Sequence, residues 1–389
     1  MNIMYTILIL LFLDRIKSRA KGNLIIELPN KKEILIGNRN EAYKIKVLKI
    51  RSIFRLLIFG LSSNGYSYYK GEWTTTDLKG ILTLGIKNIK LLKSSTLINK
   101  FVYFFLKKLS LYKSNSINRS KKQIKYHYDL GNSFYSMWLD KSMTYSSAIY
   151  DDKNYTLEDA QKNKFESIIK LARIKKDSKV LEIGCGWGGF MTHVLKKIKA
   201  DITGITLSSQ QYKYVKDIIT RKDRVRLLDY RNINRTYDKI ISIEMFEAVG
   251  KKNWSQYFKI INKSLKDGGT AVLQIITIDE DLYSEYQYKK DFIQKYIFPG
   301  GMLPTKKMLQ KLAVSNKLRL KEKKSFGQDY AKTLNIWRKN FSKNWEEIEK
   351  MGFDIQFKRL WEYYLCYCEV GFEAGTIDVS QFLIEKKLV

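Results

Sequence analysis

Short apolar runs alternate with helical segments in the second half of the chain. In residues 179–183 (KVLEI) apolar side chains are almost continuous, which is typical of a strand buried on both faces. Comparable runs predict strands at residues 201–207, 224–228, 239–243, 270–276, 318–323 and 379–386, with a turn at 265–269. Strands separated by helices predict a parallel, doubly wound α/β sheet.

The first part of the chain has a different pattern of apolar and polar residues. Residues 1–13 are apolar but too few to span a bilayer, so we expect an amphipathic or buried helix, with a signal peptide as the weaker alternative. Two strands around a Pro-Asn turn are expected next, at residues 23–36, and an apolar run follows at 51–59. A turn with a short strand is expected at 69–75, and two helices at 77–93 and 97–109.

These patterns divide the chain into three segments. Residues 1–110 are expected to form a small mixed α/β domain, and residues 161–389 the larger α/β domain with an aromatic-rich lid insertion at about 279–317. Residues 111–160 connect them and begin with a polar, basic stretch at 113–125. A solvated linker is the favoured interpretation of that stretch, and a phosphate-facing strip beside an active site is the alternative.

Composition limits the classes of function. The chain has 71 Lys and Arg against 39 Asp and Glu, a formal net charge of +32, which suggests nucleic acid or a membrane surface as partner. The amino-acid bias of an AT-rich genome would explain Lys in place of Arg but not the excess of Lys over Asp and Glu, so the excess is either functional or the result of drift. Two His and three Cys without framework spacing argue against a metal site and a disulfide scaffold, and they favour a reducing cytosol.

The most informative local motif is VLEIGCGWGGF at residues 180–190. Its glycines fit the G-x-G-x-x-G spacing of a dinucleotide fingerprint. However, the acidic residue, Glu182, lies inside the preceding strand, and the order E-x-G-x-G is that of S-adenosylmethionine methyltransferases. We therefore favour a methyltransferase over a dehydrogenase, and a tight turn without a ligand is the third interpretation.

Longer strings resemble the cyclopropane-fatty-acyl-phospholipid synthase family over essentially the whole chain. They include HYDLGNSFYSMWLD, MTYSSAIY, GITLSSQQ, MFEAVG and FGQDYAKTLNIW, at residues 127–140, 143–150, 204–211, 245–250 and 326–337. The resemblance implies a class I methyltransferase fold, with a mostly parallel seven-stranded sheet and a small N-terminal lipid-binding domain. It also implies methylene transfer from S-adenosylmethionine to the cis double bond of unsaturated phospholipid acyl chains, which forms cyclopropane fatty acids.

The resemblance also implies site residues. The positions that match family cofactor contacts are Tyr145, Ser146, Gly184, Gly186, Thr206, Gln211, Asp229, Tyr230 and Ile243. Similar proteins hold a bicarbonate ion as the base; three of its contacts match at Glu247, Ile276 and Tyr330, but Ser147 replaces a Cys and Gln274 a His. These departures leave bicarbonate binding open, and Glu247 could itself be the base. Cys368 matches a Cys sometimes proposed as catalytic, although a buried, inert thiol is the better interpretation.

The expected chemistry calls for a dry, aromatic pocket. An isolated alkene is a poor nucleophile, so the enzyme must position it against the sulfonium methyl and stabilise the resulting carbocation. Six aromatic residues are candidates: Tyr135, Trp138, Tyr145, Phe246, Tyr296 and Tyr330. Ordinary core packing is the favoured interpretation for each of them except Tyr145 and Tyr330.

Three classes of function remain open at this point. The leading hypothesis is transfer to an unsaturated acyl chain, and its product is either a ring or a methyl- or methylene-branched chain. A nucleic-acid methyltransferase is disfavoured, because the chain has neither an NPPY-like tetrapeptide nor a Pro-Cys dipeptide. The third class is a non-catalytic membrane-binding protein that keeps the fold.

The leading hypothesis also predicts where the protein acts. We expect a cytoplasmic protein that docks peripherally on anionic lipids at the inner face of the membrane. The candidate contacts are the apolar residues 1–13 and a set of lysines, Lys100, Lys107, Lys108, Lys121 and Lys122. The sequence leaves open whether the protein forms a homodimer.

Overall fold

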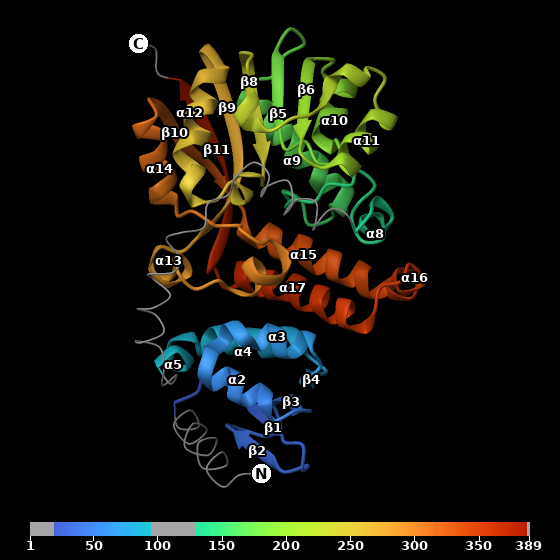
Figure 1. Cartoon of the computed structure of the whole chain (residues 1–389), viewed down its shortest axis with the longest axis vertical. Helices are drawn as coiled ribbons and strands as arrows, with labels where there is room; N and C mark the ends of the chain where they lie inside the picture. Colours follow the sequence, from blue (N-terminus) through green and yellow to red (C-terminus); the bar gives the residue numbers. More distant parts are fainter. Residues whose placement is uncertain (1–18, 95–129, 387–389) are drawn as a thin grey trace.

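The computed structural model describes residues 19–94 and 130–386, which form the two parts seen one above the other in Figure 1. The N-terminal part contains a four-stranded sheet in the order β2-β1-β3-β4. Its strands are β1 (Leu24–Glu27), β2 (Glu33–Ile36), β3 (Tyr43–Val47) and β4 (Trp73–Thr75). β1 and β2 pair antiparallel on either side of the predicted Pro-Asn turn.

Helices of the N-terminal part lie between this sheet and the rest of the chain (Figure 1). They are α2 (Arg51–Phe59), α3 (Asn64–Tyr69), α4 (Leu78–Lys87) and α5 (Ile89–Ser94). The helical pattern predicted for residues 77–93 is divided at Asn88, whose side chain donates hydrogen bonds to the carbonyls of Lys21 and Leu84. Such side-chain bonds to the backbone compete with helix continuation.

The larger part contains a seven-stranded sheet in the order β10-β11-β9-β8-β5-β6-β7. The strands are β5 (Lys179–Ile183), β6 (Asp201–Thr206), β7 (Val225–Leu227), β8 (Tyr237–Ile243), β9 (Leu265–Ile278), β10 (Leu318–Ser325) and β11 (Ile377–Lys386). β5 to β9 are joined by parallel pairs, and β11 pairs antiparallel with β9 and β10. The predicted mostly parallel α/β sheet is confirmed.

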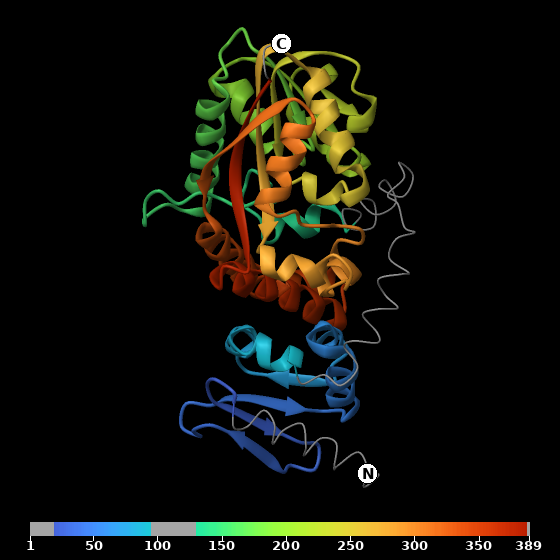
Figure 2. The same cartoon turned by 90° about the vertical axis from the view of Figure 1, so that its left-hand side faces the viewer.

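Helices cover both faces of this sheet (Figure 2). One face packs against α9 (Leu157–Ala172), α10 (Gly189–Lys197) and α11 (Ser209–Ile218), and the other against α12 (Trp254–Ser264) and α14 (Lys306–Ser315). Neighbouring strand residues such as Val180 and Leu181 belong to opposite cores, because side chains alternate along a strand. Both are fully buried, which explains the continuous apolar runs in the sequence.

Three helices between β10 and β11 connect the two parts. They are α15 (Gly327–Lys343), α16 (Trp345–Lys350) and α17 (Ile355–Glu373), and α17 packs against α3, α4 and α15. Around them lies an aromatic core in which Trp138, Trp337 and Trp361 are almost completely buried. The short helix α8 (Asn132–Ser136) belongs to the same core, so residues 130–140 are part of the packed protein.

Two sequence expectations change in detail. The turn predicted at residues 265–269 lies inside β9, where the pairing with β8 jumps from Tyr237–Leu265 to Lys239–Thr270. The predicted insertion at 279–317 contains α13 (Glu280–Tyr286), a π-helical turn (Ile293–Ile297) and α14, and α14 is a sheet-covering helix that buries Leu309. The lid prediction therefore applies only to the residues before α14.

Several predictions fall outside the described residues. These are the apolar residues 1–13, the helix at 97–109, the basic stretch at 113–125 and all five candidate membrane lysines. Within residues 19–94 and 130–386, no helix combines the length and the apolar character needed to cross a membrane.

Candidate active site

A glycine-rich turn follows β5 and opens the first cavity. Gly184 and Gly186 have φ angles of 80° and 54°, a region that glycine adopts without steric cost. The amides of Gly184 and Cys185 both donate to the Ile205 carbonyl, which ties the turn to β6. A Cβ at Gly184 would come within 2.7 Å of Met245, whereas a Cβ at Gly186 would project into open space. The turn therefore leaves room beside Gly186.

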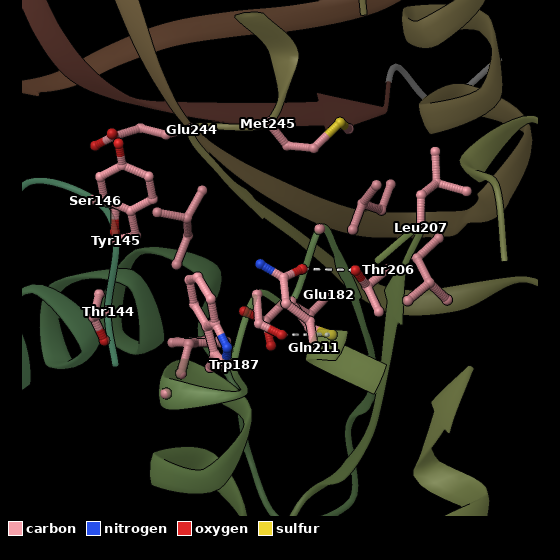
Figure 3. Close-up of a pocket in the computed structure, with 18 of the residues that line it drawn as sticks. Thr144, Tyr145, Ser146, Glu182, Trp187, Thr206, Leu207, Gln211, Glu244 and Met245 are labelled. Atoms are coloured by element: carbon pink, nitrogen blue, oxygen red, sulfur yellow. Dashed lines mark hydrogen bonds between the residues drawn. The ribbon is translucent and has the colours of Figure 1, made fainter. Parts of the chain in front are cut away.

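This cofactor pocket is a cavity of about 160 Å³ at the carboxyl ends of β5, β6 and β8. Eight of the nine predicted cofactor residues line it: Tyr145, Ser146, Gly184, Gly186, Thr206, Gln211, Tyr230 and Ile243. In Figure 3, Tyr145 and Glu244 lie on one side of the pocket, and Thr206 and Gln211 lie on the other. Tertiary folding has thus brought together residues from five separate segments of the chain.

The polar groups of the pocket fit S-adenosylmethionine. The Thr206 hydroxyl donates to Gln211 Oε1 over 2.8 Å, and this leaves the amide nitrogen of Gln211 as a donor (Figure 3). Glu182 is almost completely buried, and its Oε2 has no hydrogen-bond partner within the described protein. A buried, unpaired carboxyl oxygen is costly, so a ligand donor such as the cofactor's ammonium group would satisfy it.

Asp229 differs from the other predicted cofactor contacts. Its carboxylate is buried and does not line the pocket. It accepts hydrogen bonds from Arg231 Nε at 2.8 Å and from Arg231 Nη2 at 2.7 Å. In this structure Asp229 therefore shapes the turn that presents Tyr230, and its own contact with the cofactor stays a prediction.

A second and larger cavity adjoins the first. This acyl cavity has a volume of about 440 Å³ and is lined mainly by apolar side chains. Its walls come from α4 and α5 of the N-terminal part, from the segment between α13 and residue 303, and from α15 and α17. Representative lining residues are Leu82, Ile86, Phe292, Leu334 and Tyr363. A pocket of this size and polarity suits a hydrocarbon chain.

The two cavities meet at three shared residues, Tyr145, Glu244 and Ala248. Tyr330 also lines the acyl cavity. Of the six aromatic residues considered from the sequence, only Tyr145 and Tyr330 line either cavity. Tyr135 and Trp138 are packed into the aromatic core and Phe246 into the core beneath α12, as expected from the favoured core interpretation.

Glu244 is the principal functional candidate that the sequence analysis missed. It directly follows β8 and has a φ of 49°, an uncommon conformation for a residue with a side chain. Its Oε1 accepts hydrogen bonds from the Ser147 amide at 2.9 Å and from Gln274 Nε2 at 2.8 Å. Its Oε2 accepts one from the Tyr330 hydroxyl at 2.5 Å. Its place at the carboxyl end of a parallel strand was the available sequence signal.

The residues predicted to hold bicarbonate are brought together, but their donors are already used. Ser147, Gln274 and Tyr330 all bond Glu244, and the Ile276 amide donates to Glu247 Oε1 at 2.6 Å. The Ser147 hydroxyl, expected to face an anion, donates instead to the Ala148 carbonyl. The arrangement does not fit a bound bicarbonate ion, because its donors already serve two protein carboxylates.

The surroundings of Glu244 and Glu247 give their carboxyl groups different pKa values. Burial, followed by the charge of Glu244, raises the pKa of Glu247 to about 8. Burial also raises the pKa of Glu244, but the Tyr330 hydrogen bond and the charge of Lys164 act in the opposite direction. Glu244 has three donors and Glu247 has one amide donor, so Glu244 is the better place for the negative charge.

Lys164 is a second residue that the sequence analysis missed. It lies on the buried face of α9, and its ammonium group donates to the Ser146 hydroxyl at 2.7 Å. Burial lowers its pKa to about 8, although the charges of Glu244, Asp140 and Glu182 oppose the shift. The lysine therefore places a buried positive charge close enough to act on Glu244.

Cys368 lies on α17 and lines the acyl cavity. Burial raises its pKa far above the ordinary value of a thiol, so it is protonated at neutral pH. It does not line the cofactor pocket and makes no hydrogen bond to Glu244 or Glu247. Its position favours a wall of the cavity over a nucleophile.

Sequence comparisons identify relatives over most of the chain. The sequence pattern of the family described as mycolic acid cyclopropane synthetase matches residues 115–382. Tuberculostearic acid methyltransferase UfaA1 of Mycobacterium tuberculosis is 32% identical over 342 residues, which are 84% of this chain and 79% of that protein. Cyclopropane-fatty-acyl-phospholipid synthase of Escherichia coli K12 is 33% identical over 339 residues, 85% of either chain.

Solved structures give the same answer for the fold. The cyclopropane synthase MmaA2 from Mycobacterium tuberculosis aligns with a TM-score of 0.64 and 29% identity, over 68% of this chain and 98% of that one. The mycolic acid cyclopropane synthase CmaA1, complexed with SAH and CTAB, aligns with a TM-score of 0.63, 28% identity and the same coverage.

Proposed function

The chain belongs to the mycolic acid cyclopropane synthetase family of S-adenosylmethionine-dependent methyltransferases, and we propose that it modifies the cis double bond of unsaturated acyl chains in phospholipids. The product that we propose is a cyclopropane ring across the former double bond. The bound cofactor would supply an electrophilic methyl group, and the chain's own residues would hold the alkene against it and receive the released proton.

One observation carries this proposal: a polar cofactor pocket and a large apolar cavity meet at Tyr145, Glu244 and Ala248. A chain lying in the apolar cavity would reach the cofactor only at this junction. Aromatic and aliphatic side chains line the acyl cavity beside the junction, and a substrate chain packed among them would displace the water that could capture a carbocation. Positioning of this kind supplies much of the rate when the reaction partners are intrinsically unreactive.

Two aromatic side chains are placed to stabilise positive charge on the acyl chain. The Tyr145 and Tyr330 rings both line the acyl cavity beside Glu244. The Tyr145 hydroxyl shares a 2.6 Å hydrogen bond with that of Tyr364, which fixes the orientation of the ring. A fixed aromatic face attracts a cation without forming a bond to it.

A branched product is the second candidate. The similarity to a protein named tuberculostearic acid methyltransferase favours it, whereas the relatives named as cyclopropane synthases favour a ring. After methyl transfer, a hydride shift followed by proton loss would give a methylene branch, whereas direct proton loss from the methyl carbon would close a ring. Both routes need the same cavity and a base.

The experiment is lipid analysis after expression in a host that contains unsaturated phospholipids. We expect mass spectrometry to detect acyl chains 14 mass units heavier for a ring, as one CH₂ is added. A methylene branch also adds 14, but it takes up hydrogen on catalytic hydrogenation under conditions that leave the ring intact. Unchanged acyl chains, together with measured cofactor binding by the purified protein, would reject the proposal.

We also propose peripheral docking on anionic membranes from the cytoplasmic side. Support comes from the net charge of +32 and from the acyl substrate, which has to be lifted from a bilayer. The test is sedimentation with phosphatidylglycerol vesicles in low and high salt. Binding should fall steeply as salt rises, and binding that is unchanged by salt would reject the electrostatic explanation.

A further inference from the structure

Glu244 lies at the boundary of the two cavities, beside the place where a transferred carbon would have to pass. It is one of the three residues shared by the cofactor pocket and the acyl cavity, and it carries the only carboxyl group among these three. Its amide donates to the Gln274 carbonyl at 2.8 Å, which anchors the residue to β9. The carboxylate is therefore held at the boundary between cofactor and acyl chain.

The donors around Glu244 come from three of the residues that the sequence resemblance assigns to an external anion, although Ser147 contributes its amide and not its hydroxyl. The Ser147 amide, the Gln274 side chain and the Tyr330 hydroxyl bond its two oxygens, which leaves one of the roughly four acceptor positions of the carboxylate. The Gln274 Oε1 in turn accepts from Gln381 at 3.3 Å, so the amide orientation is set by β11. A carboxylate and a bicarbonate ion present the same planar pair of oxygens, and here the protein supplies that pair.

Its charge is also accounted for within the site. The buried Lys164 acts on Glu244 through its charge, and Glu247 is kept in its neutral form by burial and by the proximity of Glu244. Only one oxygen of Glu247 is bonded, and its Oε2 has no partner within the described protein. Two neighbouring carboxyl groups do not both ionise readily. Glu244 therefore stays ionised and can act as a base, while Glu247 keeps its proton.

We propose that Glu244 is the base of the reaction and replaces a bound bicarbonate ion. This inference rests on the proposed function. The alkene π pair bonds to the methyl carbon as its bond to sulfur breaks, and S-adenosylhomocysteine keeps the sulfur pair. The adjacent chain carbon is left positive. A Glu244 oxygen then takes a proton from the former methyl carbon, and the C–H pair closes the ring.

The same base serves the branched product. After a hydride shift, removal of a proton from the former methyl carbon leaves the C–H pair as the second bond of a methylene group. In both cases the proton resides on Glu244 until solvent accepts it after product release. The assignment of the base is therefore independent of which product forms.

The test compares wild type, Glu244→Gln and Glu244→Ala with S-adenosylmethionine and unsaturated phospholipid vesicles. Wild-type turnover should change less than twofold between CO₂-free buffer and 10 mM bicarbonate. Glu244→Gln should lose at least about a hundredfold in turnover, the usual contribution of a general base, while calorimetry shows cofactor affinity within a few fold of wild type. Glu244→Ala should regain turnover when formate is added, because formate can enter the vacated space.

The matched control is Glu362→Gln, a half-buried carboxyl near Tyr68 that lines neither cavity. It should keep wild-type turnover and show no response to formate. The inference is overturned if bicarbonate removal lowers wild-type turnover tenfold, or if Glu244→Gln keeps more than a tenth of it. A wild type that binds cofactor but modifies no unsaturated lipid would reject the proposed function. That result differs from the two outcomes that overturn the assignment of Glu244.

Discussion

Glu247→Gln should stabilise the protein, and the gain should grow with pH. The substitution keeps the shape of the side chain and an oxygen that can accept the Ile276 amide, but it removes the ionisable proton. In the folded wild type, burial and the charge of Glu244 raise the pKa of Glu247 to about 8, compared with an ordinary value of 4.5. Between these two pH values the unfolded chain releases a proton that the folded chain retains.

The sign and size follow from proton linkage. Because the folded state binds more protons, the wild-type free energy of unfolding falls as pH rises from about 4.5 to 8 and levels off above it. One unit of pKa difference is worth about 1.4 kcal/mol, so the full penalty is at most roughly 5 kcal/mol. Since Glu244 and Glu247 titrate together, we expect about 2–5 kcal/mol in favour of the variant at pH 8.5 and much less at pH 5.

Urea unfolding of both proteins at pH 5.0, 6.5 and 8.5 measures the difference. Glu369→Gln is a control of opposite sign. Burial alone would raise the pKa of Glu369, but the bonds from Arg338, Lys79 and Asn335 outweigh it and lower the pKa. Its charge therefore stabilises the fold above about pH 4.5, and the variant should be destabilised by a similar amount at all three pH values. A Glu247→Gln gain that does not change with pH would refute the reasoning.

Two further substitutions test the cavities. Gly186→Ala should weaken cofactor binding at least tenfold by calorimetry, because Gly186 lines the cofactor pocket and a Cβ there would take up open space beside it. Gly375→Ala has a similar positive φ and equally open surroundings, and it should only lower stability by about 1 kcal/mol. Equal cofactor affinities in the two variants would contradict this assignment. Cys368→Ala should keep lipid turnover within about threefold, because the buried thiol stays protonated; loss of turnover with intact cofactor binding would show a chemical role.

The fold was largely predictable because its signals are local. Each of the seven strands appears in the sequence as an apolar run near its final position, and β5 was predicted to the residue. Glycines 184 and 186 could be interpreted because a turn at the end of a buried strand requires positive φ. Residues 265–269 have the local propensity of a turn, and the prediction of a turn was wrong there. They lie inside β9, because pairing with β8 resumes beyond them.

The active site was only partly predictable, because its contacts are not local. Eight of the nine predicted cofactor residues line one pocket, and the ninth, Asp229, lies outside that pocket and bonds Arg231, two residues away. Glu244 escaped notice for the opposite reason. Its three donors come from residues 147, 274 and 330, which sequence spacing does not relate.

The sequence by itself determined the sheet, the glycine turn and the class of cofactor, since these depend on periodicity and on backbone conformations that neighbouring residues specify. Only the tertiary structure decided which carboxyl group carries the charge and how the N-terminal helices complete the acyl cavity. Both depend on burial and on hydrogen bonds between distant segments, and these exist only once β8, β9 and α15 are packed together.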